Sequence, residues 1–177
     1  AGLLRTILED PERKAGTGLD GIMAGYAMLK PSAGWDFLRG VLKNTKEEFM
    51  FRYAALRAVR FLHDYRPDVV SKKDLINGLM VMVNQEDIAD LVIEDLRKWQ
   101  CWDKADEVLA VLKTESAKQP IVKRSILRYA LQCAGNKSAS EYVAERRKAD
   151  AKAVEEAEEL LKLEMDSTKP ATTPVKK

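Results

Sequence analysis

The chain has few of the residues that build common metal, redox and disulfide sites. Its 177 residues include two cysteines and one histidine. Cys101 and Cys133 lie 32 residues apart within apolar helical patterns and form no CxxC pair. Neither a zinc site nor a disulfide framework is therefore predicted. The carboxylates are spread along helical patterns without the spacing of a calcium loop. We expect no metal and no cofactor.

Neither sign of charge dominates, and no apolar run is long. The 30 Lys and Arg residues face 28 Asp and Glu residues, for a net charge of +2. Binding to phosphates through counterion release needs a clustered surplus of cations. This balance argues against nucleic-acid binding as the main function. No apolar run approaches the roughly 18 residues that a membrane-spanning helix needs.

The start of the chain suggests a piece of a longer protein. It begins at Ala1 without methionine, and it lacks the basic-then-apolar plan of a secretory signal. The stretch "LLRTIL" has the pattern of a helix whose partner lies upstream, so we expect the C-terminal part of a longer chain. An N-terminal signal that has been removed is an alternative. No compartment is assigned, with the cytoplasm slightly favoured, and the oligomeric state is left open.

Glycine and proline are also sparse, and their positions predict helices. The chain has nine Gly and six Pro residues, none of them inside an alternating Val/Ile/Thr run, and no such run predicts a strand. We expect at least seven helices. Three helix starts are predicted from side-chain oxygens that would cap free backbone N–H groups: Thr45 with Glu48, Ser71, and Ser138 with Glu141.

Three segments repeat one apolar template, at spacings of 37 and 34 residues. They begin at Phe51, Ile88 and Val122, and their apolar residues at offsets of four, five, eight and eleven fall on one broad helical face. These residues are Ala55, Leu56, Val59 and Leu62, then Val92, Ile93, Leu96 and Trp99, then Ile126, Leu127, Ala130 and Cys133. A weaker copy starts at Gly18 and carries Ile22, Met23, Tyr26 and Leu29.

Shorter amphipathic segments lie between the copies, so each unit is a pair of helices. A single pair cannot bury both of its faces, and stacked neighbours would share a continuous core. We therefore predict an all-α fold, a right-handed α-α superhelix (solenoid) of three to four helix pairs over residues 1–137. A charged helix, or two joined helices, should follow over 138–165 and cap the last repeat, and the tail 166–177 should be disordered.

The segments "FRYAALRAVRFL" and "VKRSILRYALQC" resemble the second helix of HEAT-like (armadillo-type) repeats. In that family an apolar residue, a basic residue and a small or aliphatic pair open the inner helix. The middle copy departs from this pattern because Ala89 stands where the basic residue belongs. A tetratricopeptide-like repeat is the rival, since "CWDKADEVLAVL" resembles its second helix. Either resemblance implies a binding function without catalysis.

The aligned repeats assign different positions to the basic residues. Arg52 and Lys123 stand beside the buried face, where we expect them to pack between repeats. The more exposed offset six carries Arg57, Glu94 and Arg128, so charges of opposite sign should pair along the ridge of second helices. Our candidate partner-binding surface on this ridge consists of Tyr53, Arg57, Phe61, Glu94, Trp102 and Arg128.

The function predicted is a non-catalytic scaffold that binds a protein partner or another domain of its parent chain. The alternative is a nucleic-acid-binding helical repeat, in which basic residues of the same helices would converge on one concave face. Those residues are Arg52, Arg57, Arg60, Lys98, Lys123, Arg124 and Arg128. The acidic middle repeat would interrupt such a phosphate track.

Two motifs suggest catalysis or a cofactor but fit a structural role better. "GTGLDG" matches GxGxxG, but the preceding "EDPERKA" is no buried strand, so we read Thr17 as a helix cap. His63 stands beside Asp64 with no nucleophile at a local spacing, and a cation near a helix C-terminus is favourable by itself. We expect no catalytic residues.

Overall fold

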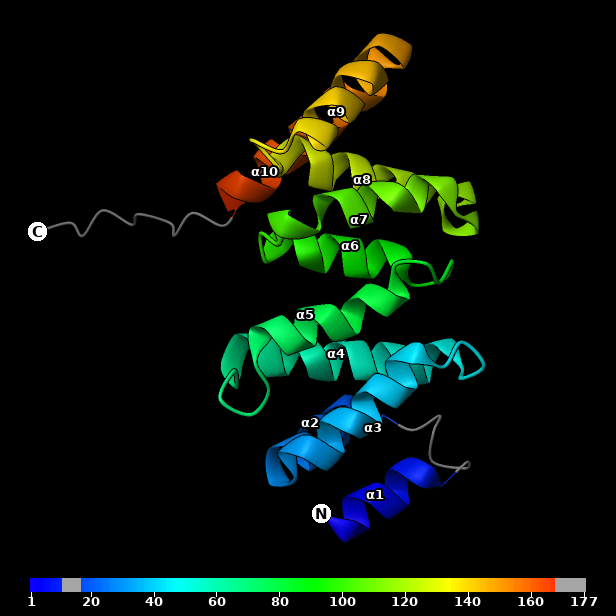
Figure 1. The fold of residues 1–177 in the computed structure, drawn as a ribbon, viewed down its shortest axis with the longest axis vertical. Helices are drawn as coiled ribbons and strands as arrows, with labels where there is room; N and C mark the ends of the chain where they lie inside the picture. The colour runs from blue at the N-terminus through cyan, green and yellow to red at the C-terminus, as the bar shows by residue number, and fades with distance from the viewer. Residues whose placement is uncertain (11–16, 168–177) are drawn as a thin grey trace, which may run out of the picture. The chain divides into compact units, whose positions relative to one another are not determined.

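The computed structural model describes residues 1–10 and 17–167. The described residues form helices and no strand, which confirms the all-α prediction (Figure 1). The chain divides into two compact units, Ala1–Val92 and Ile93–Lys177. The α-helices are α1 (Gly2–Glu9), α2 (Leu19–Leu29), α3 (Pro31–Lys43), α4 (Phe49–Tyr65), α5 (Lys72–Leu79), α6 (Ala89–Lys98), α7 (Ala105–Ala110), α8 (Pro120–Gln132), α9 (Lys137–Ala149) and α10 (Ala151–Ser167). Short 3-10 turns flank α5, α7 and α8.

In the first unit, α2 packs between α1, α3 and α4. Pro31 opens α3, where a missing N–H group costs nothing. One turn later, Gly34 brings the two backbones together, because a Cβ atom there would lie 2.7 Å from the Ala27 nitrogen. Glycine is therefore required by the close crossing of α2 and α3.

The apolar template is buried almost throughout. In the copy on α4, all five positions are at most 1% exposed. In the other two full copies only Trp99 is half-buried, and the rest are buried. The weak first copy fails at its end, because Leu29 is the last residue of α2 and is 59% exposed. Helical periodicity therefore identified the core side of these helices.

One of the three predicted helix starts is confirmed. The Ser71 hydroxyl accepts a hydrogen bond from the Asp74 N–H at 3.1 Å and caps α5. The prediction for Thr45 is wrong, because α4 begins only after Glu48. Asn136, two residues before Ser138, caps α9 by accepting from the Ala139 N–H at 2.9 Å. Likewise Gly18, with φ of 79°, precedes α2 in place of the expected Thr17 cap.

Arg52 is buried against the turn that precedes α6, whereas Lys123 is not buried. The Arg52 side chain is 5% exposed and donates to Gln85 Oε1 at 2.7 Å and to the Glu47 carbonyl at 3.0 Å. It also forms an ion pair with Asp87. Gln85 in turn donates to the Leu42 carbonyl at 2.8 Å. Lys123 is exposed, so the prediction of packing is wrong there.

In the second unit, α8 is held to the residues that follow α6. The Tyr129 hydroxyl donates to the Cys101 carbonyl, and the Trp102 ring meets the Tyr129 ring edge-on at 5.2 Å. Cys101 and Cys133 are buried, unpaired thiols. Burial raises the pKa of Cys101 to about 11 and also raises the pKa of Cys133.

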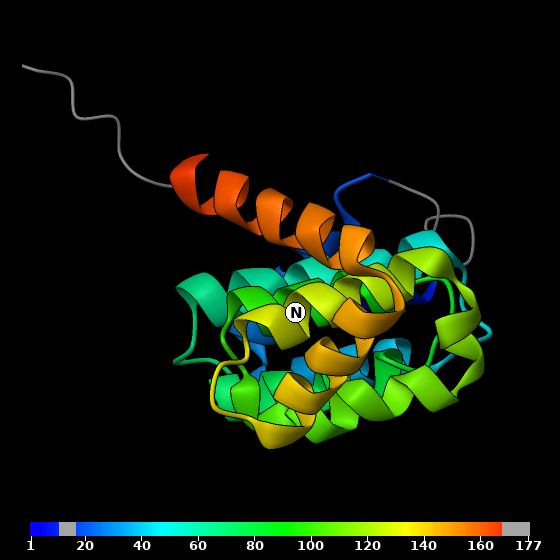
Figure 2. The same ribbon diagram turned by 90° about the horizontal axis from the view of Figure 1, so that it is seen from above.

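The C-terminal region consists of two helices, α9 and α10, rather than one long helix. They join at Asp150, whose carboxylate accepts a hydrogen bond from the Ala153 N–H at 3.1 Å. The chain then turns back, and α10 runs beside α9 to reach α8 (Figures 1 and 2). Leu127 of α8 packs there with Val154 and Ala157 of α10.

The end of α10 corrects one boundary. Residues 166 and 167 belong to α10, so the predicted disordered tail 166–177 began two residues too early. The remainder of that prediction lies outside the described residues.

Candidate functional site

The six sequence-predicted partner residues fall into two groups. Tyr53, Arg57 and Phe61 lie on α4 in the first unit, whereas the other three lie in the second. The three on α4 stand four residues apart, and extending this spacing in both directions adds Phe49 and Tyr65. We call this row of five side chains, Phe49, Tyr53, Arg57, Phe61 and Tyr65, the α4 ridge. Residues four apart form the ridges by which helices pack into grooves of other helices.

The aromatic side chains of the α4 ridge form two ring pairs, of which Phe49–Tyr53 is stacked and Phe61–Tyr65 is tilted by 34°. The Phe49 and Tyr53 rings are nearly parallel, with centroids 5.8 Å apart, and the Phe61 and Tyr65 rings lie 5.6 Å apart. Phe61 is 38% exposed and Tyr65 is 72% exposed. The contact within each pair holds the two rings in a defined orientation, which lowers the entropy lost when another surface binds.

Arg57 stands between the two aromatic pairs and is fixed by an ion pair. One of its guanidinium nitrogens lies 2.9 Å from an Asp20 carboxylate oxygen of α2, although the Arg57 side chain remains 55% exposed. The Arg60 guanidinium lies 5.9 Å from the Tyr53 ring centroid, within reach of a cation–π interaction. The ridge thus combines aromatic rings with one oriented cation, Arg57, and a second cation, Arg60, lies beside it.

A shallow cavity of about 260 Å³ adjoins the α4 ridge. It lies between the start of α2 and α4, and Asp20, Met50, Tyr53 and Arg57 contribute to its walls. Met50 is 61% exposed at its edge. The cavity could receive one side chain of a partner, while the aromatic row supplies a flat contact surface beside it.

Glu94 and Arg128, the predicted ridge residues of the second unit, are engaged within that unit. We call Glu94, Arg97, Arg128, Gln132 and Glu164 the Arg97 network. Arg97, whose side chain is 3% exposed, donates to Glu94 at 2.8 Å, to Gln132 at 2.6 Å and to both carboxylate oxygens of Glu164. Arg128 donates to Glu164 at 2.7 Å.

The predicted pairing of opposite charges at offset six is present in one case. The Arg128 Nε atom lies 3.5 Å from Glu94 Oε1, and neither buried atom has a hydrogen-bond partner. Glu164 of α10 forms ion pairs with both Arg97 and Arg128, so α10 covers part of the candidate partner-binding surface around Arg128. Sequence periodicity could not reveal that contact, since Glu164 lies 36 residues beyond Arg128.

Trp102 has a packing role. It is half-buried, and its ring contacts Tyr129. It therefore fills the junction before α7, and only part of its surface remains available to a partner.

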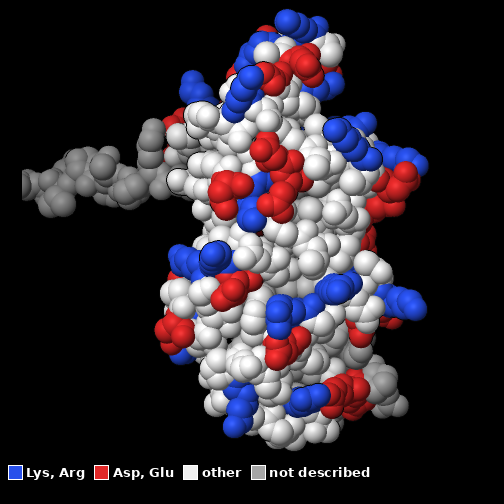
Figure 3. Space-filling model, viewed as in Figure 1, with Lys and Arg blue, Asp and Glu red and all other residues white. Residues whose placement is uncertain are grey.

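Some of the basic residues required by the nucleic-acid alternative already form ion pairs within the protein. Arg52 is buried and paired with Asp87, Arg57 is paired with Asp20, and Arg128 is bonded to Glu164. Lys98, Lys123 and Arg124 are exposed. On the face drawn in Figure 3, Lys and Arg side chains are interspersed with Asp and Glu side chains. This distribution does not match a phosphate track of one sign.

The histidine and the carboxylates assemble no metal centre in the part of the chain that the structure describes. His63 is 6% exposed, and its Nδ1 atom lies 2.8 Å from an Asp64 carboxylate oxygen. No group of three His, Cys, Asp or Glu side chains among residues 1–10 and 17–167 could hold a metal ion. None of the helices in these ranges has the length and apolar character needed to cross a bilayer.

The sequence offered a signal for the two ridge residues that the candidate list missed. Phe49 and Tyr65 share the four-residue spacing of Tyr53, Arg57 and Phe61, but the alignment of the apolar template starts at Phe51 and places them outside its shared offsets.

Comparisons of the chain with protein-family models, with curated proteins and with solved structures found no match.

Proposed function

We propose that this chain is a non-catalytic protein-interaction scaffold, and that it binds a protein partner or another domain of its parent chain through the α4 ridge. The observation that carries the proposal is the row of two aromatic ring pairs in contact, one stacked and one tilted, on either side of Arg57. Tyr, Trp and Arg dominate the energetic centres of protein interfaces, and charged and aromatic side chains in fixed positions require little rearrangement on binding.

The proposal includes a HEAT-like arrangement of the helix pairs as a right-handed superhelix. Its support is the burial of the shared apolar template in three segments, and the bridge from Arg52 of the first segment to Gln85 and Asp87, which immediately precede the second. In this arrangement the second helices present their outer rows side by side, and the α4 ridge is one such row.

The experiment is quantitative capture from a nuclease-treated native lysate with the chain immobilised, followed by affinity measurement with each purified protein that is captured. The test variant is Phe61→Ala/Tyr65→Ala. The control is Leu29→Ala/Val81→Ala, which also removes exposed apolar side chains but lies outside α4. Loss of each interface anchor costs about 1–2 kcal/mol, so the double variant should weaken binding by about tenfold or more.

The outcomes separate the functional classes. A protein that binds the control variant normally and the Phe61/Tyr65 variant at least tenfold more weakly supports the proposal. A partner that binds both variants equally well shows that the α4 ridge is not the site. Recovery of nucleic acid, but of no protein, in a parallel capture from lysate that has not been treated with nuclease would favour the nucleic-acid alternative.

A further inference from the structure

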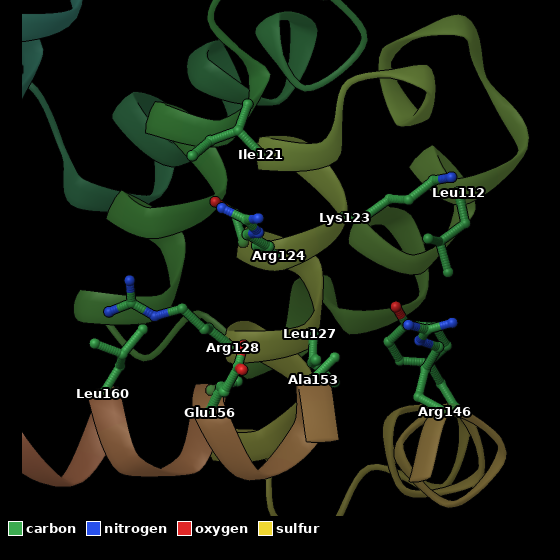
Figure 4. A pocket seen from close by; sticks show the side chains of 13 residues that line it. Leu112, Ile121, Lys123, Arg124, Leu127, Arg128, Arg146, Ala153, Glu156 and Leu160 are labelled. Atoms are coloured by element: carbon green, nitrogen blue, oxygen red, sulfur yellow. The ribbon is translucent and has the colours of Figure 1, made fainter. Parts of the chain in front are cut away.

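A second candidate binding surface lies within the second unit, on the side of α8 that faces α9 and α10. A groove of about 520 Å³ runs there, with Leu127 and Ala157 in its floor and Lys123, Arg124 and Arg146 among its walls. Figure 4 shows that α8 contributes Arg124 and Arg128, while Leu160 and Glu156 come from α10. We call this surface the α8–α10 groove. It is independent of the α4 ridge and of the proposed function.

The groove has a surplus of positive charge. Four basic side chains line it, together with a single carboxylate, that of Glu156. Arg128 is neutralised by Glu164, and Arg146 lies 3.7 Å from Asp150. Lys123 and Arg124 form no ion pair with any described residue. These two cations are exposed and available to an acidic occupant.

Apolar side chains accompany these cations. The exposed large apolar residues of the second unit, within the described range 93–167, all belong to α8 or α10. They are Ile121, Leu160, Leu163 and Met165, with exposed fractions from 50% to 66%. Concentration of exposed apolar side chains on two neighbouring helices is typical of an interaction surface.

Helix α10, on the other side of the groove from α8, carries exposed negative charge. Its sequence "AVEEAEELLKLEMD" places Glu155 and Glu159 on exposed positions, next to the exposed Leu160 and Leu163. α10 is therefore an acidic amphipathic helix with apolar residues on its outer side. The neighbouring α8 offers Lys123 and Arg124 beside the exposed Ile121.

We propose that the occupant of the α8–α10 groove is a second copy of this chain. In the resulting two-fold dimer, the outer side of α10 of each copy lies against Lys123 and Arg124 on α8 of the other. A two-fold interface must be complementary to itself, and this surface has both halves, a basic apolar helix beside an acidic apolar helix. The apolar residues provide burial, while the charges set the register.

The test is sedimentation equilibrium of the full chain across the micromolar range, where the monomer mass is 19.9 kDa. The wild type should approach twice this mass as concentration rises. Lys123→Glu/Arg124→Glu should raise the dimer dissociation constant by at least about tenfold, and Glu155→Lys/Glu159→Lys should do the same. Mixing the two variants should restore a dimer, because each copy then meets opposite charges on both helices.

The control variant Lys137→Glu/Lys148→Glu makes the same charge change at two exposed positions on α9 outside the groove, and it should dimerise like the wild type. Circular dichroism verifies that each variant keeps its helix content. A wild type that stays monomeric throughout would overturn the proposal. So would a dimer that neither groove variant weakens, or two weakened variants whose mixture remains monomeric. An acidic peptide from another protein or a nucleic acid would be the next occupant to examine after such a result.

Discussion

Replacement of Arg52 by methionine should destabilise the first unit strongly. Methionine is about as long as arginine and apolar, so the change removes hydrogen bonds while leaving little empty space. The buried Gln85 Oε1 and the Glu47 carbonyl lose the donors that now lie 2.7 Å and 3.0 Å away. Gln85 is 7% exposed, and water cannot readily replace its lost partner.

The size of the effect follows from the partners that remain. Hydrogen bonds from a charged donor contribute about 1.5–3 kcal/mol each when buried. The Asp87 side chain is 49% exposed, so its carboxylate can become hydrated again and adds little to the loss. We expect Arg52→Met to lower the free energy of unfolding by about 2–4 kcal/mol, mostly through Gln85 and the Glu47 carbonyl.

Urea unfolding followed by circular dichroism measures this loss, and Arg57→Met is the matched control on the same helix. Arg57 makes an ion pair with Asp20 while its side chain remains 55% exposed, so its loss should cost less than about 1 kcal/mol. The urea midpoint should therefore fall by about 1 M or more for Arg52→Met and change little for the control. Equal midpoints for the two variants would refute the assigned role of the buried arginine.

The same variant has a predictable pH dependence. The hydrogen bond from Arg52 is the largest effect on Asp87, and it lowers the pKa of that carboxyl below its usual range. A carboxyl with a lowered folded-state pKa stabilises the fold fully above its unfolded value of about 3.9, and this contribution disappears as pH falls through the lower folded value. The stability difference between wild type and Arg52→Met should therefore narrow below about pH 4.

Three further predictions concern packing, the Arg97 network and the thiols. In urea unfolding, Gly34→Ala should destabilise the fold by about 1–3 kcal/mol, because its Cβ atom would meet the Ala27 backbone of α2. Gly40 on the same helix has open space, so Gly40→Ala should stabilise the fold by about 0.5–1 kcal/mol. Equal effects of the two variants would contradict the close crossing of α2 and α3. Burial opposes ionisation of Glu164, but Arg97 and two other cations outweigh burial and lower the pKa of this carboxyl. The ionised carboxylate therefore stabilises the fold above about pH 4.3, and this contribution is lost as the pH falls further. Glu164→Gln should lack this contribution, so acid titrations should show a smaller loss of stability below about pH 4.3 for the variant than for the wild type. Burial raises the pKa of Cys101 to about 11, and a thiol reagent at pH 8 should modify it far more slowly in the native chain than in urea; equal rates would show that the thiol is accessible.

The sequence by itself determined the helical class and the buried side of each copy of the apolar template. Phe51, Ile88 and Val122 head three copies of one apolar pattern, and burial follows that pattern because a helix turns through about 100° per residue. The four-residue spacing of the α4 ridge was also present in the sequence, since side chains on one exposed row need no distant partner to be placed.

Only the tertiary structure decided which charged residues are buried or paired with distant parts of the chain. Arg52 and Lys123 occupy equivalent positions in the apolar template. Arg52 bonds to Gln85 and Asp87 and is buried, whereas Lys123 lines an open groove. Glu164 similarly reaches back 67 residues to Arg97. Such contacts depend on where the chain turns, and the contact of Glu164 depends on the turn at Asp150. Helical periodicity describes one helix at a time, so the periodicity carries no information about partners that distant segments supply.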